Sequence, residues 1–114
     1  MSDIPHPLPD ALVELVAARF RVLSEPMRIK LLDRLREGDA TVQELQEGLG
    51  VSQQNVSKHL GVLLRAGMVR REKQGTYSRY AIADPSVFAL CDQVCGGLRR
   101  QAAELDAILR PVVS

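Results

Sequence analysis

The sequence has little of what an extracellular or membrane-embedded protein needs. Its two cysteines lie four residues apart, which is not the disulfide framework of a small secreted domain. No apolar run approaches the roughly 20 residues that a membrane-spanning helix requires. The N-terminal stretch MSDIPHPLPD is acidic and rich in proline, unlike a signal peptide. We therefore expect a cytoplasmic protein with no membrane partner.

Recognisable catalytic motifs are also missing. The sequence has no glycine-rich phosphate loop, and its two histidines and two cysteines are not spaced as a catalytic triad or a metal-hydrolase motif. An enzyme is therefore not expected. At 114 residues, the chain is expected to form a single domain spanning residues 1–114. A domain of this size buries only a modest share of its surface, so pairing with a second copy would stabilise it.

What the sequence does contain is an uneven distribution of charge. The net charge is +1, but residues 52–80 hold six basic side chains and one acidic side chain, Glu72. This segment thus carries +5 and the rest of the chain −4. A local basic surface on a near-neutral protein is typical of a protein with a polyanionic partner. The alternative is a charged face that only contacts water. The order of the predicted elements, described next, distinguishes these two interpretations.

Apolar spacing predicts two helices in the first third of the chain. The first covers residues 10–20. The second begins at Pro26, where the missing N–H costs little, and runs to about residue 36. Its inward side is expected to hold Ile29, Leu32 and Leu35.

Residues 41–66 predict a helix-turn-helix. Thr41 and Glu44 have the spacing of a capping box, which would open a short helix over about 41–48. Ser52 is suited to cap the next helix, about 52–66, and Gly67 stands where a left-handed residue ends a helix. The turn between the helices contains glycine and is three to four residues long.

Residues 68–83 predict a β-hairpin, with a turn at Gln74-Gly75. Asp84-Pro85 would then begin a last helix, about 86–109. That helix has a broad apolar face, which favours dimerisation over packing within one chain. Its seam consists of Val87, Cys91, Val94, Leu98, Leu105 and Ile108. The predicted fold class is mostly α with a small β-hairpin, in the order α-α-α-α-β-β-α.

The helix over 52–66 has two distinct faces. Val56, Leu60 and Leu63 form an apolar stripe, while the opposite face has amide, ammonium and guanidinium groups and no carboxylate. Recognition helices place their N-terminal residues against base edges in the DNA major groove. His59, at the edge of the stripe, has either a packing role or a phosphate contact. The candidate DNA-binding residues are Ser52, Gln53, Gln54, Asn55, Ser57, Lys58, His59, Arg70, Arg71, Lys73 and Arg79.

The segments FRVLSEPMRIKLLDRL (20–35) and TVQELQEGLGVSQQNVSKHLGVLLRAGMVRREKQGTYSRYAI (41–82) resemble the ArsR/SmtB family of winged-helix repressors. The pattern Leu-x-x-Pro-x-Arg, formed here by Leu23, Pro26 and Arg28, is part of that likeness. The resemblance implies a winged helix-turn-helix with the wing at 68–83 and a homodimer paired through helices 10–20 and 86–109. It also implies double-stranded DNA with an inverted-repeat operator as the partner, and an inducer that weakens DNA binding.

Many relatives of this kind sense metals, but the usual ligands are absent here. No thiol occurs at 42–45, where metal-sensing relatives carry cysteines in the third helix. Of the last-helix positions used by zinc sensors, only Asp84 fits. The remaining ligand positions of zinc and cadmium sensors correspond to Ser86, Gly97, Arg100, Val62 and Ala66. No metal site is therefore assigned.

Cys91 and Cys95 are the remaining candidate sensor. Residues four apart share one face of a helix, so both thiols could bind one soft metal ion or metalloid, or act as a redox switch. Two ligands are too few for tetrahedral zinc, although a dimer could offer four. Plain apolar packing is the alternative. A regulator without an inducer and a protein-interaction module remain as rival functions.

Overall fold

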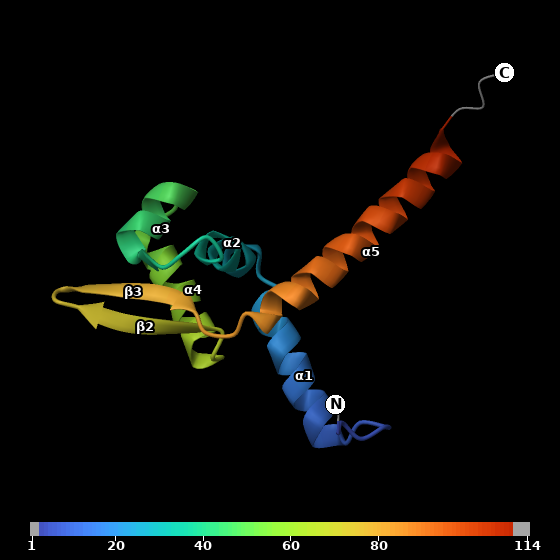
Figure 1. The fold of residues 1–114 in the computed structure, drawn as a ribbon, viewed down its shortest axis with the longest axis horizontal. Helices are drawn as coiled ribbons and strands as arrows, with labels where there is room; N and C mark the ends of the chain where they lie inside the picture. The colour runs from blue at the N-terminus through green and yellow to red at the C-terminus, as the bar shows by residue number, and fades with distance from the viewer. Residues whose placement is uncertain (1–2, 111–114) are drawn as a thin grey trace. The chain divides into compact units, whose positions relative to one another are not determined.

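A computed structural model of the protein describes residues 3–110. The chain divides into two units, one ending at Ala83 and one beginning at Asp84, and each is described by itself. The first unit contains α1 (Asp10–Leu23), α2 (Pro26–Leu35), β1 (Ala40–Thr41), α3 (Val42–Leu49), α4 (Gln53–Arg65), β2 (Val69–Gln74) and β3 (Tyr77–Ile82) (Figure 1). The second contains α5 (Ser86–Leu109). The predicted helix-turn-helix and hairpin are confirmed.

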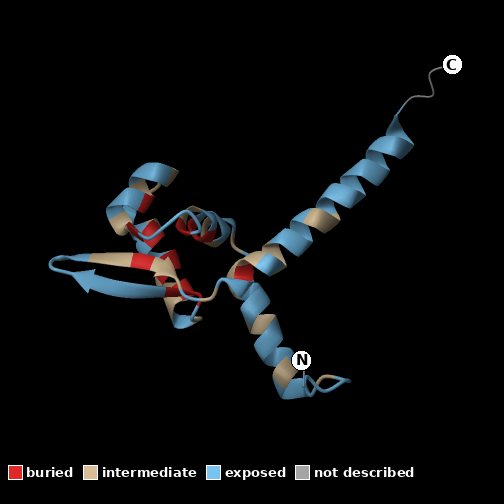
Figure 2. Cartoon of the chain, in the orientation of Figure 1, coloured by how far each residue is buried: buried red, intermediate tan, exposed pale blue. Residues whose placement is uncertain are grey.

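The core of the first unit lies where α4 packs against α2, α3 and β2 (Figure 2). Val56, Leu60 and Leu63 of α4 are fully buried there, which confirms the predicted stripe. Burying a side chain of this size stabilises the fold by about 1.5–3 kcal/mol. The other buried apolar residues of this unit are Leu31, Leu32, Leu35, Ala40, Leu45, Met68, Val69 and Tyr80.

Ile29 is a correction to the predicted inward face of α2. Its side chain is 45% exposed, whereas Leu31 is completely buried. The periodic pattern places Ile29 and Leu32 on one stripe, but the core contacts α2 through its later turns. Leu31, Leu32 and Leu35 supply these contacts.

The sheet has three antiparallel strands in the order β1-β3-β2. The hairpin pairs Val69 with Ile82 and Gln74 with Tyr77, and Gly75 adopts a left-handed φ of 64° in the turn. The sequence prediction missed β1, because two residues are too few to show strand periodicity. β1 pairs Ala40 with Tyr80 and Thr41 with Arg79, so it joins the start of α3 to the hairpin.

Local hydrogen bonds define both helices of the helix-turn-helix. The Thr41 hydroxyl accepts from the Glu44 N–H and the Glu44 carboxylate accepts from the Thr41 N–H, which confirms the capping box. The Ser52 hydroxyl accepts from the Asn55 N–H, 3.1 Å away, and caps α4. Gly67 has the expected left-handed φ, 75°.

α1 is longer than predicted and ends at Leu23 rather than residue 20. The Arg28 side chain stabilises this last turn, since it donates to the carbonyl oxygens of Arg21 and Val22. No residue of α1 is buried. Across residues 3–110, no helix has both the length and the apolar character needed to cross a bilayer.

Candidate nucleic-acid interface

The N-terminal half of α4 presents neutral polar groups and one cation to solvent. Gln53, Gln54, Ser57 and Lys58 are exposed, and the Ser52 cap fixes the first turn that carries them. Asn55 is half-buried and its N–H is held by the cap. Since α4 contains no acidic residue, its outer face does not repel phosphate. Amide and hydroxyl groups both donate and accept, as reading base edges requires.

His59 lies inside the protein, not on this face. Its side chain is 6% exposed, and its Nδ1 atom is 3.1 Å from Nη1 of Arg28. Burial lowers the pKa of His59, and the positive charge of Arg28 lowers it further. Of the two roles considered, the geometry favours packing. We therefore remove His59 from the candidate DNA contacts.

The hairpin of β2 and β3 covers 69–82 of the 68–83 predicted for the wing, is called the wing from here on, and carries the second group of candidates. Arg71 and Lys73 are exposed on β2, and neither forms an ion pair within the described part of the chain. Arg70 is also exposed, but its Nη1 donates to the Ile82 carbonyl oxygen at 2.7 Å and its Nε lies 3.6 Å from Glu72. Arg71 and Lys73 are therefore the wing cations best placed to meet an external anion.

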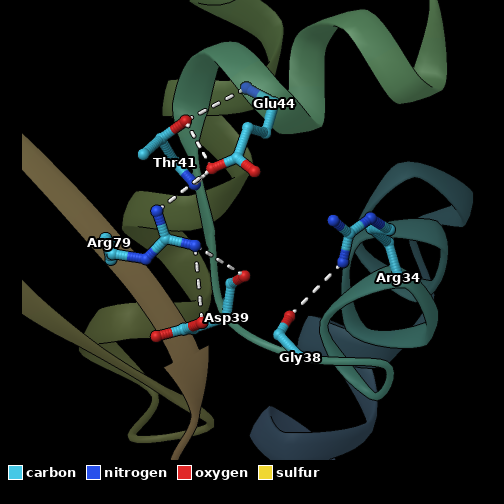
Figure 3. A network of polar contacts seen from close by, with 6 residues as sticks. All are labelled: Arg34, Gly38, Asp39, Thr41, Glu44 and Arg79. Atoms are coloured by element: carbon cyan, nitrogen blue, oxygen red, sulfur yellow. Dashed lines mark hydrogen bonds and ion pairs between the residues drawn. The ribbon is translucent and has the colours of Figure 1, made fainter.

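Arg79, the remaining predicted wing cation, is held by acceptors within the protein (Figure 3). Its guanidinium lies 3.2 Å from the Glu44 carboxylate and 3.4 Å from that of Asp39, and it donates to the Asp39 carbonyl oxygen at 3.1 Å. Asp39, the main influence, and Glu44 raise the pKa of Arg79. The sequence showed Glu44 only as a helix cap and gave no sign of its second role.

A groove of about 520 Å³ lies between α3, the start of α4 and β3. Polar side chains dominate its lining, and no basic residue is among them. The sequence prediction did not find this feature because its walls come from three separate elements. Its lining consists of Thr41, Val42, Gln43, Gln46, Glu47, Gln53, Thr76, Tyr77, Ser78 and Tyr80.

The predicted thiol pair lies on α5. Cys91 is half-buried and Cys95 is exposed. Among residues 3–110, histidine, cysteine and acidic side chains form no cluster of three or more that could hold a metal ion. Within one chain, this site therefore offers a metal no more than its two thiols.

The fold and the outer face of α4 define a winged helix-turn-helix regulator. A family model described as a helix-turn-helix domain matches residues 23–72. The chain is 37% identical over 86 residues to the "Probable mercury resistance operon repressor" of Streptomyces lividans, covering 75% of this chain and 66% of that one. It is 38% identical over 80 residues to the transcriptional repressor SmtB of Mycobacterium tuberculosis, covering 70% and 59%.

A further relative is similar in both sequence and structure. The "Uncharacterized HTH-type transcriptional regulator Rv0081" of M. tuberculosis is 36% identical over 101 residues, covering 88% of this chain and 89% of that protein. Its crystal structure has a TM-score of 0.76 and covers 84% of this chain and 97% of that one. The chain belongs to the ArsR/SmtB family, as the sequence resemblance indicated, and is a DNA-binding transcriptional regulator.

Proposed function

We propose that the protein is a dimeric repressor that binds an inverted-repeat operator and is released from it by a thiol-reactive inducer. The observation that carries the DNA-binding part is the acid-free, solvent-exposed start of α4, held in place by the Ser52 cap. Gln53, Gln54 and Ser57 would read base edges in the major groove. Lys58, with Arg71 and Lys73 of the wing, would contact guanine or phosphate.

Dimerisation is proposed from apolar side chains that a single chain leaves in water. On α1, Leu15 and Phe20 are 68% and 51% exposed. On α5, Leu98, Leu105 and Ile108 are 59%, 54% and 77% exposed. Contiguous apolar faces of this kind are typical of interfaces. A two-fold dimer would bring its recognition helices to adjacent major grooves, about 34 Å apart, which requires an inverted repeat.

The proposed inducer site is Cys91 and Cys95. The Cys95 side chain is exposed in the single chain, so it is not explained by core packing there. A soft, thiophilic ion such as Hg(II) suits two thiolates, and one relative is described as a repressor of a mercury resistance operon. A ligand that shifts α5 of one copy against the other would change the spacing of the recognition helices. It acts only through different affinities for the two dimer geometries.

The DNA-binding proposal is tested by fluorescence anisotropy with duplex DNA from beside the coding region, over a series of KCl concentrations. Affinity for the specific duplex should fall steeply as salt rises, because bound phosphates release counterions. A scrambled duplex is the control and should bind more weakly at every concentration. Binding that ignores both salt and sequence would instead indicate a protein-interaction module.

The inducer proposal is tested by titrating the protein–DNA complex with HgCl₂, sodium arsenite and hydrogen peroxide. At least one should dissociate the wild-type complex and leave the Cys91→Ser/Cys95→Ser variant bound. If the variant is released at the same concentrations, the thiols are not the sensor. If nothing releases the wild type, the protein is a regulator without a chemical inducer of this class.

A further inference from the structure

We propose that Arg79 is a positioning residue that fixes the wing against the start of α3, and not a DNA contact. This inference rests on the proposed DNA-binding function, because a fixed wing matters only if the wing has something to bind. It assigns a role to the hydrogen-bond network around Arg79, which takes no part in the proposed contacts between α4 and DNA bases. Figure 3 shows this network from close by.

Within the described residues, the side-chain hydrogen bonds of Arg79 lead away from the wing. The residue stands on β3, yet Nη1 reaches the Glu44 carboxylate on α3 and Nη2 reaches both the carbonyl oxygen and the carboxylate of Asp39. Asp39 directly precedes β1, and Glu44 lies in the first turn of α3. One guanidinium therefore joins the wing to residues on either side of β1.

The same Glu44 oxygen serves both the helix cap and the wing. Oε1 accepts from the Thr41 N–H at 3.1 Å and from Arg79 at 3.2 Å. Thr41 is also the backbone partner of Arg79 in the sheet. The start of α3 and the middle of β3 are thus tied by a backbone pairing and by a side-chain bridge that share Thr41 and Glu44.

This bridge reinforces a short connection. β1 has only two residues, so the backbone pairing that links the wing to the helix-turn-helix is short. The walls of the polar groove also come from α3 and β3. The Arg79 bridge therefore helps to fix the position of the wing relative to α3, and α3 in turn packs against α4.

The surroundings of Arg79 argue against a phosphate contact. Its side chain is 27% exposed, compared with 57% for Arg70 on the same sheet. Two carboxylates already neutralise it and would repel a phosphate placed beside them. A planar fork of donors suits the acceptors of Asp39 and Glu44, whereas a lysine ammonium is a single point charge and cannot span them equally well.

The test uses a substitution that preserves charge, Arg79→Lys, with Arg34→Lys as its matched control. The positive charge of Arg34 also acts on Glu44, but the Arg34 side chain donates to the Gly38 carbonyl oxygen and not to the wing. Both variants are measured by anisotropy against the best duplex selected for the wild type from a random pool. Each is also measured in a background that removes the wing cations, Arg71→Gln/Lys73→Gln. Thermal melting verifies that every variant is folded.

We expect Arg79→Lys to weaken binding by about five-fold or more, and Arg34→Lys by less than about two-fold. In the Arg71→Gln/Lys73→Gln background, the effect of Arg79→Lys should largely disappear, because the wing then has little left to position. Glu44→Gln gives a second measurement, since glutamine retains the capping box and loses the ion pair. It should reproduce part of the loss.

Two results would overturn the inference while the DNA-binding proposal stands. Wild-type affinity in Arg79→Lys would mean that positive charge alone suffices at this position. An equal loss in both backgrounds would mean that Arg79 acts through the whole fold or touches DNA itself. If the selection yields no duplex that wild-type protein binds, the proposed function fails, and the positioning role fails with it.

Discussion

Nη1 of Arg28 lies 3.1 Å from Nδ1 of His59, and this contact joins α2 to the buried side of α4. Arg28 also donates to the carbonyl oxygens of Arg21 and Val22 at the end of α1. One side chain thus connects three helices. Nδ1 of His59 can accept a hydrogen bond from Arg28 only while it carries no proton.

Acid should therefore destabilise the protein through His59. Burial and the Arg28 charge lower its pKa below the usual 6.5, while Glu25 opposes this shift and Lys58 adds to it. The stability that comes from neutral His59 is complete above pH 6.5 and is lost as the pH falls through the lower pKa of the folded state. Urea unfolding at pH 7.5, 6.5 and 5.5 should show a falling free energy of unfolding.

His59→Asn is the matched variant for that measurement. The amide can still face Arg28 but does not titrate, so its free energy of unfolding should change less over this pH range. His6 is present in both proteins, and the difference between them isolates position 59. Equal slopes would show that His59 does not cause the acid sensitivity.

Truncation on α2 should separate the core from the surface. Leu32→Ala removes a side chain that is 2% exposed and should cost about 2–5 kcal/mol. Ile29→Ala removes one that is 45% exposed and should cost less than about 1.5 kcal/mol. Chemical denaturation measures both. Equal losses would mean that Ile29 is covered in the form of the protein that exists in solution.

The two helix caps should contribute separately to stability. Thr41→Ala and Ser52→Ala each remove a hydroxyl that accepts a backbone N–H, and each should cost about 1 kcal/mol. Thr41→Ser and Ser52→Thr keep the acceptor and should restore most of the loss. Ser52→Ala should also weaken DNA binding, because it frays the turn that carries Gln53 and Gln54. Unchanged melting in the alanine variants would contradict this account.

The wing cations should determine part of the salt dependence of binding. Log affinity falls with log salt concentration, and removing one phosphate contact makes this negative slope shallower by about 0.9. Arg71→Gln and Lys73→Gln should each make the slope shallower by this amount on all duplexes, with sequence preference retained. Glu72→Gln on the same strand is the control and should not make the slope shallower. A shift in preferred sequence in either cation variant would indicate a base contact instead.

Charges on α5 should break the dimer if its apolar face is the interface. Leu98→Glu and Leu105→Glu replace side chains that are more than half exposed in the single chain. Each should convert the protein to a monomer in light scattering after size exclusion. Gln93→Glu adds the same charge at an exposed position of the same helix that lies outside the apolar seam, and it should leave the mass unchanged. A dimer that persists in both leucine variants would place the interface elsewhere.

Features set by neighbouring residues were predictable from the sequence. The Thr41 and Ser52 caps, the Gly67 helix end and the stripe of Val56, Leu60 and Leu63 each follow from residues within one or two turns. The bounds of α5 also match the prediction. In each case the deciding interaction is local, so the pattern carries enough information.

Features set by distant residues were not predictable. Arg79 meets Asp39 across 40 positions, and Arg28 meets His59 across 31. From the sequence, Arg79 is assigned by its charge and His59 by its place in the helical period, and neither property identifies a partner so distant in the sequence. β1 exists because β3 lies beside it, and Ile29 is exposed because the core meets α2 elsewhere.

The cap at Ser52 and the buried stripe of α4 together fix how the helix is rotated about its axis. Inserting one residue between Gln54 and Val56 would turn Gln53 and Gln54 by about 100° relative to that stripe, away from any base they had met. The target site can therefore change in evolution through substitutions on the exposed face of α4, whereas insertions or deletions between Ser52 and the buried stripe are not tolerated.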